Sequence, residues 1–331
     1  MKYNVAIVGA TGKVGRTFLE VLEKRNFPIN NLYLYASKKS AGSKLLFNNK
    51  EYEVIELSRE NIKSSIDYAF FSAGGDISLE YSPLFAEKNA TVIDNSSAFR
   101  MDPNIPLIVP EVNGDEALNN NKIIANPNCS TIQAVVALKP LHDKFKIKRI
   151  IYSTYQAVSG AGNYGVKDLY IEDESQLKKF QYLINGNLIP QIDVFMENGY
   201  TKEEMKMINE TKKILKDDFL KITATCVRVP IVNSHSESIN VEFQNNITLP
   251  DVINTLENFN GIKILDDIKN NIYPMPKYIT GKDEVFVGRI RLDESCENTI
   301  NMWVVADNIL KGAALNAVQI AEYIIKNKGD K

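Results

Sequence analysis

The chain has 331 residues, of which 44% are hydrophobic and 24% charged, a balance that excludes disordered and fibrous proteins. Its 39 Lys and Arg residues against 41 Asp and Glu residues give a net charge of −2, which argues against a nucleic-acid partner. No apolar run approaches the ~20 residues of a membrane helix, and no signal peptide is recognisable, so we expect no membrane partner. Three cysteines are too few and odd in number for a disulfide framework, which favours a cytoplasmic location.

The first part of the chain alternates short apolar runs with helical patterns. The spacing predicts strands at residues 4–8, 32–35, 54–55, 68–72, 91–94 and 123–125, and helices at residues 12–24 and 79–88. Such alternation predicts a parallel sheet with helices on both of its faces.

From residue 148 onward, long β-rich runs replace this alternation. They predict strands at residues 149–157, 222–229, 238–243, 285–292 and 299–305, with a polar helix at 201–215 and an amphipathic helix at 310–325. Runs of strands with few helices between them favour a mostly antiparallel sheet. We therefore predict an α/β protein in which a Rossmann-like dinucleotide-binding domain precedes an α+β domain with a mostly antiparallel sheet.

A glycine-rich turn, Gly9-Ala10-Thr11-Gly12-Lys13-Val14-Gly15, lies between the first predicted strand and the first predicted helix. Small residues let the backbone approach a pyrophosphate, and the N–H groups of the helix start attract its charge. The pattern predicts nucleotide binding; the alternative is a tight turn without a ligand.

The second predicted strand is followed by Ser37-Lys38-Lys39-Ser40 and not by the acidic residue that usually binds the ribose hydroxyls of NAD. Two cations and two hydroxyls suit a 2′-phosphate, which favours NADP. The alternative is an exposed polar loop.

Cys129, in Asn126-Pro127-Asn128-Cys129-Ser130-Thr131, follows a predicted strand and precedes a helix predicted over 131–144. The positive end of a helix stabilises a thiolate, so the sequence predicts a nucleophile suited to thioester chemistry. The alternative is a small buried cysteine, which is our expectation for Cys226 and Cys296.

The two histidines differ in context. His142 lies late in the predicted helix, where a structural role is expected, and His235 lies in a polar break between two predicted strands. In such a break His235 can face a cleft as an acid–base group, or it can be a surface residue. Arg228 lies in an apolar strand and needs either a bound anion or a structural ion-pair partner.

Taken together, these residues resemble the aspartate-β-semialdehyde dehydrogenase family over essentially the whole chain. The motifs that carry the resemblance are Val8-Gly9-Ala10-Thr11-Gly12-Lys13-Val14-Gly15, Pro127-Asn128-Cys129-Ser130-Thr131, Tyr155-Gln156-Ala157-Val158-Ser159-Gly160-Ala161-Gly162, Glu203-Glu204-Met205-Lys206, Cys226-Val227-Arg228-Val229-Pro230, His235-Ser236-Glu237-Ser238 and Val287-Gly288-Arg289-Ile290-Arg291.

The resemblance implies a role for each matching position. The implied catalytic residues are the nucleophile Cys129, the acid–base residue His235 and the substrate-orienting Gln156. The implied substrate-binding residues are Arg100, Asn128, Gln156, Glu203, Lys206 and Arg228, with Arg228 on the substrate carboxylate, Glu203 near its amino group, and Arg100 and Lys206 on phosphate. The implied NADP-binding residues are Gly9, Thr11, Gly12, Lys13, Val14, Ser37, Lys39, Ser40, Ser72, Ser159, Gly160 and Asn308.

The resemblance also implies the domains and the reaction. Residues 1–128 form the dinucleotide-binding domain, to which a C-terminal helix at 309–331 returns, and residues 129–308 form the catalytic and dimerisation domain. The implied reaction is NADPH-dependent reductive dephosphorylation of L-aspartyl-4-phosphate to L-aspartate-4-semialdehyde and phosphate, through a cysteine thioacyl intermediate and without a metal. This reaction serves the synthesis of lysine (with diaminopimelate), threonine and methionine, and the implied assembly is a homodimer or homotetramer. The alternatives are an N-acetyl-γ-glutamyl-phosphate reductase and a non-catalytic, dinucleotide-binding redox sensor.

Overall fold

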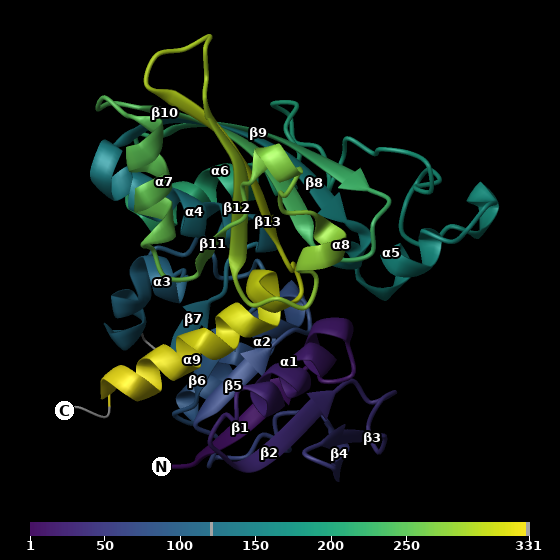
Figure 1. The fold of residues 1–331 in the computed structure, drawn as a ribbon. Coiled ribbons are helices and arrows are strands. Elements are labelled where there is room, and N and C mark those ends of the chain that lie inside the picture. The colour runs from purple at the N-terminus through teal and green to yellow at the C-terminus, as the bar shows by residue number, and fades with distance from the viewer. Residues whose placement is uncertain (120–121, 329–331) are drawn as a thin grey trace. The chain divides into compact units, whose positions relative to one another are not determined.

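The computed structural model describes residues 1–119 and 122–328, which form two compact units (Figure 1). One unit consists of Met1–Asn128 and Ala313–Lys331, and we call it the N-terminal unit. The other consists of Cys129–Gly312, and we call it the central unit.

The N-terminal unit is built on a seven-stranded sheet with the strand order β3-β4-β2-β1-β5-β6-β7. The strands are β1 (Tyr3–Val8), β2 (Ile29–Ala36), β3 (Lys44–Phe47), β4 (Lys50–Glu56), β5 (Tyr68–Phe71), β6 (Thr91–Asp94) and β7 (Ile123–Ala125). All neighbours are parallel except β3 and β4, which form an antiparallel pair at one edge. The predicted parallel sheet is therefore confirmed.

Helices cover both faces of this sheet. They are α1 (Lys13–Lys24), α2 (Gly75–Glu87), α3 (Pro110–Asn113), the 3-10 turn η1 (Gly114–Asn119) and α9 (Leu315–Lys328). Successive strand residues point to opposite faces. Accordingly Phe70 packs on Phe18 of α1, with ring centroids 5.1 Å apart, and Phe71 packs on Phe85 of α2, with ring centroids 5.2 Å apart.

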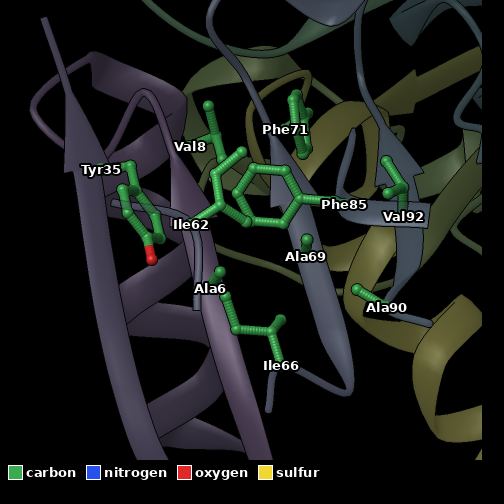
Figure 2. Close-up of a cluster of buried hydrophobic side chains, with 10 residues drawn as sticks. All are labelled: Ala6, Val8, Tyr35, Ile62, Ile66, Ala69, Phe71, Phe85, Ala90 and Val92. Carbon is green, nitrogen blue, oxygen red and sulfur yellow. The ribbon is translucent and has the colours of Figure 1, made fainter. Parts of the chain in front are cut away.

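Figure 2 shows the core on the α2 side of the sheet. Phe85 lies between Phe71 of β5 and Tyr35 of β2, whose ring centroid is 5.7 Å from its own. The Tyr35 hydroxyl donates a hydrogen bond to the Asn61 carbonyl, so this buried ring leaves no polar atom unsatisfied. This packing fixes β1 and β2, and with them the glycine turn that follows β1.

The central unit is built on a six-stranded sheet with the strand order β11-β12-β13-β10-β8-β9. Its strands are β8 (Ile147–Ala157), β9 (Lys221–Val229), β10 (His235–Phe243), β11 (Ile262–Ile264), β12 (Val285–Leu292) and β13 (Thr299–Ala306). The three inner pairings are antiparallel and the two outer ones are parallel. The predicted mostly antiparallel sheet is confirmed.

Helices α4 (Cys129–Phe145), α6 (Lys202–Leu215) and α7 (Leu249–Glu257) lie against this sheet. The shorter elements are η2 (Val158–Ala161), α5 (Gly162–Asp168), η3 (Glu174–Gln176), η4 (Ile268–Asn270), α8 (Pro276–Ile279) and the π-helical turn η5 (Leu310–Ala314). Helix α6 begins with a capping box: Thr201 accepts from the Glu204 N–H, and Glu204 accepts from the Thr201 N–H. The predicted helix at 201–215 is therefore confirmed to within one residue.

Three expectations from the sequence are wrong. The sequence predicts a polar break between strands around His235, but β10 begins at this residue. The backbone of β10 pairs with β8 and β13 from His235 onward, and its polar side chains there are buried. Cys296 is exposed, because it follows β12 in the connection to β13. The C-terminal helix begins with a π turn, and its first two turns are buried on nearly all sides, including the polar residues Lys311 and Asn316, so burial is not confined to one apolar face.

None of the helices within residues 1–119 and 122–328 is both long enough and apolar enough to cross a membrane.

The glycine turn generates a stability prediction. A Cβ on Gly15 would lie 2.1 Å from the Gly9 carbonyl oxygen, so Gly15→Ala forces backbone atoms apart. We expect Gly15→Ala to lower the free energy of unfolding by more than about 2 kcal/mol in urea titrations. Gly75→Ala, at the open start of α2, is the matched control and should unfold at or slightly above the wild-type midpoint. Wild-type stability in Gly15→Ala would contradict the steric argument.

Candidate active site

One row of side chains crosses four strands of the central sheet. Ala306 of β13 pairs with His235 of β10, and Gln156 of β8 pairs with Arg228 of β9. The last registered pair of β10 and β8 is Ser236 with Tyr155, so His235 and Gln156 occupy the next position along these strands. Because side chains alternate between the faces of a sheet, the register aligns His235, Gln156 and Arg228 on one face. We call these three residues the catalytic row; all three are buried.

Cys129 is the first residue of α4, the helix that lies against the same sheet. The positive end of the helix therefore acts on its thiol. Arg228 interacts electrostatically with this thiol from the sheet. Gly312 also lies close to Cys129: a Cβ on it would lie 2.8 Å from the Cys129 Cβ. The structure thus places a partly exposed thiol between a helix start and a guanidinium.

Gln156 connects the start of α4 to the start of α6. Its Nε2 donates to the Ser130 hydroxyl, and also to Glu203 Oε1 at 3.0 Å. Its Oε1 is buried and has no hydrogen-bond partner among the residues that the structure describes. The amide orientation is fixed by its two acceptors, so the carbonyl oxygen is available to a bound molecule.

Lys206, one turn along α6, is held by two carboxylates. Its Nζ lies 3.0 Å from Glu203 Oε2 and 2.8 Å from Asp193 Oδ2. Burial alone would lower the pKa of Lys206, but these two carboxylates outweigh it and raise that pKa. Lys206 is therefore a cation at neutral pH, beside the acidic Glu203 predicted at the substrate amino group.

Arg228 is buried, and its Nη1 donates to the Ala157 carbonyl at 2.7 Å. Burial lowers the pKa of the guanidinium, and the charges of Glu203 and Cys129 oppose this shift. Even so, an arginine stays protonated in proteins. A buried cation next to a thiol and a carboxylate suits the binding of an anionic substrate group.

His235 is fully buried, and its Nδ1 accepts a hydrogen bond from the Ala157 backbone N–H at 2.9 Å. Its Nε2 has no hydrogen-bond partner within residues 1–119 and 122–328. Burial is the main cause, and the Arg228 charge the second, of a decrease in the pKa of His235 to about 3. The Glu203 charge acts in the opposite direction and is the smallest of the three effects. The imidazole is therefore neutral at physiological pH.

A second buried polar row lies next to the catalytic row on the same face. Glu237 of β10 pairs with Thr154 of β8, which pairs with Cys226 of β9. Neither Glu237 oxygen has a hydrogen-bond partner in the described part of the chain, and burial raises the pKa of Glu237 well above its usual value. Burial thus disfavours a negative charge on Glu237 beside His235. Burial also raises the pKa of the Cys226 thiol, which confirms the expected buried cysteine.

Three of the residues predicted to bind the cofactor lie beside the catalytic row. Asn308 Nδ2 donates to the Ser159 hydroxyl at 3.0 Å, and Asn308 Oδ1 accepts from the Ser234 N–H at 2.8 Å. A Cβ on Gly160 would lie 3.1 Å from Arg228 Nη1 and 3.4 Å from His235 Nε2. The glycine therefore leaves room next to both side chains.

The glycine turn of the N-terminal unit has the geometry of a phosphate cradle. Gly9 has φ +86°, and a Cβ on it would lie 2.8 Å from the Ser72 carbonyl oxygen. Gly12 is the N-cap of α1 and makes no side-chain cap, and Lys13 and Val14 begin the helix. Thr11 lies in the turn between Gly9 and Gly12. Close backbone approach and the start of a helix fit a dinucleotide pyrophosphate.

The predicted 2′-phosphate site lies directly after β2. Ser37 and Lys39 are exposed, and Ser40 is half-buried. The turn is closed by the Ser40 N–H, which donates to the Ser37 carbonyl at 2.8 Å. The cationic side chain of Lys39 is thus accessible to an anion beside the end of β2.

Arg100 and Asn128 are also in the N-terminal unit, and both are buried. Arg100 Nε donates to the Asn126 carbonyl at 2.9 Å, and its Nη2 donates to the Asn95 carbonyl at 3.0 Å. The Asn126 amide is itself held by Asn95 and Asn316. Backbone carbonyls thus hold the Arg100 guanidinium, which also interacts electrostatically with Asp94.

His142 lies in the last turn of α4, and its Nδ1 accepts from the Ile147 N–H at 3.3 Å. This contact agrees with the structural role expected for it. Within the described residues, no cluster of three or more His, Cys, Asp and Glu side chains is arranged to hold a metal ion.

Comparisons with known proteins show the family to which this chain belongs. The sequence matches the models of "Semialdehyde dehydrogenase, NAD binding domain" over residues 4–120 and "Semialdehyde dehydrogenase, dimerisation domain" over residues 138–311. It is 55% identical to an aspartate-semialdehyde dehydrogenase of Aquifex aeolicus, covering 98% of this chain and 99% of that protein. The chain belongs to the aspartate-semialdehyde dehydrogenase family.

Other members of the family agree along the full length. The Bacillus subtilis aspartate-semialdehyde dehydrogenase is 49% identical, over 98% of this chain and 97% of that one. A crystal structure of the Vibrio cholerae aspartate semialdehyde dehydrogenase II complexed with ASA superposes with a TM-score of 0.93 at 47% identity, over 98% and 99% of the two chains. The Candida albicans enzyme with NADP gives 0.79 at 27% identity, over 98% of each chain. The family resemblance, the oxidoreductase class and an NAD(P)-binding domain are therefore confirmed.

Some residues around the site of this family member were not predicted from the sequence. Ser130 accepts a hydrogen bond from Gln156, and Asp193 accepts one from Lys206. Glu204 accepts a hydrogen bond from the Cys226 N–H and so connects α6 to β9, and Gly312 lies close to Cys129. Only Glu204 carries a local signal, because Thr201 and Glu204 have the spacing of a capping box.

The buried His235 generates a pH prediction. Because its pKa is about 3 in the folded protein and about 6.5 when unfolded, His235 contributes stability above pH 6.5 that is lost as the pH falls toward 3. Between pH 7 and pH 5, the free energy of unfolding should fall by about 2 kcal/mol more in the wild type than in His235→Gln. Urea titrations at both pH values measure this difference, and equal losses in the two proteins would contradict the neutral histidine.

Proposed function

We propose that this protein catalyses the NADPH-dependent reductive dephosphorylation of L-aspartyl-4-phosphate to L-aspartate-4-semialdehyde, through a thioacyl intermediate on Cys129. The observation that carries the proposal is the position of Cys129, which begins α4 and faces Arg228 of the catalytic row. A helix start and a guanidinium both favour a thiolate, the nucleophile that acyl transfer from an acyl phosphate requires.

In this proposal, side chains bind the substrate through charges opposite to its own. We assign Arg228 to the substrate carboxylate, because a guanidinium forms two parallel hydrogen bonds with such a group. We assign Glu203, beside Gln156 and Lys206, to the substrate ammonium group. A free ammonium group distinguishes this substrate from an N-acetylated one, which carries no charge there. Gln156 presents its carbonyl oxygen and orients the substrate.

The leaving phosphate needs cations. Lys206 is the cation of the central unit that we assign to it, and this requires phosphate to compete with Asp193 for the Lys206 ammonium group. Arg100 and Asn128 of the N-terminal unit are further proposed phosphate and substrate ligands, an assignment that rests on the family resemblance. Cys129 attacks the acyl carbon as phosphate departs, and His235 serves as the acid–base residue at the acyl oxygen.

The cofactor assignment follows from the fit of the glycine turn. Gly9, Thr11, Gly12, Lys13 and Val14 would hold the pyrophosphate, with Ser72 beside them. Ser37, Lys39 and Ser40 would favour NADP over NAD, and Ser159, Gly160 and Asn308 are proposed further contacts. When bound, NADPH supplies the hydride that reduces the thioester. We accordingly propose that residues 1–128, with the C-terminal helix at 309–331, form the dinucleotide-binding domain and that residues 129–308 form the catalytic and dimerisation domain.

We also propose a homodimer or homotetramer, which the match to a dimerisation domain supports. A cytoplasmic location is supported by the three cysteines, none of which forms a disulfide. The reaction would then belong to the synthesis of lysine, threonine and methionine.

The activity is tested in the reverse direction, where NADPH absorbance rises on oxidation of the aldehyde. We expect a phosphate-dependent rise with NADP⁺ and L-aspartate-4-semialdehyde, and none with N-acetyl-glutamate semialdehyde. A slower rise with NAD⁺ would fit the assignment of Lys39. If neither aldehyde gives a rise with folded protein that binds NADPH, the non-catalytic redox sensor becomes the better account.

The nucleophile is tested by substitution. Cys129→Ser should abolish turnover while NADPH affinity, measured by fluorescence titration, stays within about twofold of the wild type, since the glycine turn is intact. Cys296→Ser is the matched control, because this exposed thiol follows β12 outside the catalytic row, and it should retain full turnover. Normal turnover in Cys129→Ser would refute the assignment.

A further inference from the structure

Lys206 has two carboxylate partners that differ in burial. Its Nζ lies 3.0 Å from Glu203 Oε2 and 2.8 Å from Asp193 Oδ2. The Glu203 side chain is 7% exposed, whereas the Asp193 side chain is 34% exposed. Breaking an ion pair costs little where water hydrates the released charge, and much more where water has no access. Asp193 is therefore the partner that Lys206 can give up.

The Asp193 carboxylate is held in place without Lys206. Asp193 lies in the connection that precedes α6, and its backbone has the left-handed conformation, with φ +69°. Its Oδ1 accepts a hydrogen bond from the Val194 N–H at 2.9 Å, and its Oδ2 accepts the one from Lys206. If another anion took Lys206, the carboxylate would keep its backbone contact and would stay beside that anion.

The charges beside Lys206 oppose a second anion. Burial alone would raise the pKa of Asp193, but the Lys206 ammonium group and the Val194 N–H lower it below its usual value. Asp193 is thus an anion at neutral pH, and together with Glu203 it gives the group around Lys206 an excess of negative charge. A substrate ammonium group would compensate Glu203. The charge of Asp193 would then remain next to a phosphate bound at Lys206.

This inference rests on the proposed function, in which Lys206 binds the leaving phosphate. We propose that Asp193 is a positioning residue that competes with phosphate for the Lys206 ammonium group. It holds Lys206 while no phosphate is bound, and it takes Lys206 back as phosphate departs. Glu203, one turn earlier on α6, keeps Lys206 at the site during this exchange.

The exchange favours the forward reaction. A phosphate that stays beside the thioester on Cys129 can attack the acyl carbon, which breaks the C–S bond and re-forms the acyl phosphate and the thiolate. By weakening phosphate binding, Asp193 shortens the time in which this return reaction is possible. The thioester is then available for reduction.

The competition can be measured with Asp193→Asn. Asparagine tolerates the left-handed backbone, and its side-chain oxygen can still accept from the Val194 N–H, so the variant removes the charge with little change in structure. In the reverse reaction, we expect the KM for phosphate to fall about threefold to fivefold, as for removal of a partly exposed ion pair, while the KM for L-aspartate-4-semialdehyde changes by less than about twofold.

Asp218→Asn is the matched control. This exposed residue lies in the connection between α6 and β9, and its substitution removes the same charge and should leave both KM values unchanged. An unchanged KM for phosphate in Asp193→Asn would overturn the proposal. A raised KM would also overturn it, because Asp193 would then orient Lys206 toward phosphate and not compete with it.

Phosphate binding can also be measured without turnover. Inorganic phosphate, titrated at constant ionic strength, raises the urea unfolding midpoint according to its affinity for the folded protein. We expect Asp193→Asn to bind phosphate more tightly than the wild type, and we expect this difference to vanish in a Lys206→Met background, where no ammonium group is left to compete for. Equal affinities of the wild type and Asp193→Asn, or a difference that persists with Lys206→Met, would contradict the competition.

These measurements separate the inference from the proposed function. If the wild type does not oxidise L-aspartate-4-semialdehyde, the proposed function fails, whereas the urea titrations still report the competition at Lys206. If the wild type is active and Asp193→Asn binds phosphate no more tightly, only the present inference fails.

Discussion

The register between β10 and its neighbours β8 and β13 is the constraint on which the proposed active site depends. Three residues that are far apart in the sequence, Gln156, Arg228 and His235, become neighbours only because their strands pair at these positions. A slip of one residue in β10 would turn His235 to the opposite face of the sheet from Gln156 and Arg228. Cys129 comes close to these side chains because α4, which lies against the same sheet, begins at this residue. The chemistry thus depends on backbone pairing distributed over the whole sheet.

Burial and the few charges beside this row set the protonation states of its neighbours. Burial favours the protonated form of Glu237 and the unprotonated form of His235, whereas Lys206 remains charged because two carboxylates lie beside it. The charges that persist include those of Arg228 and Lys206, which we propose bind the substrate carboxylate and the leaving phosphate. In the second row, burial disfavours a further negative charge on Glu237.

The sequence predicts the parts of this arrangement that are local. An apolar run followed by helical spacing places Cys129 at a helix start, and a glycine turn after a strand predicts the phosphate cradle. The start of β10 at His235 could not be predicted in this way, because its polar residues are buried by partners on β8 and β13 that the local pattern does not reveal. The same holds for Gly312, whose contact with Cys129 joins residues nearly two hundred positions apart, and for Asp193, whose partner is on α6. The roles of Glu203, Lys206 and Arg100 came from the family resemblance and not from their local context.

The central claim is that Cys129 carries the acyl group. It is tested most directly by incubating the enzyme with NADP⁺ and L-aspartate-4-semialdehyde in the absence of phosphate. Without the acyl acceptor, we predict one equivalent of NADPH per active site and a protein whose intact mass has increased by one aspartyl group. Peptide mapping should place that group on Cys129. NADPH formation without a bound acyl group, or an acyl group on Cys226 or Cys296, would contradict the account.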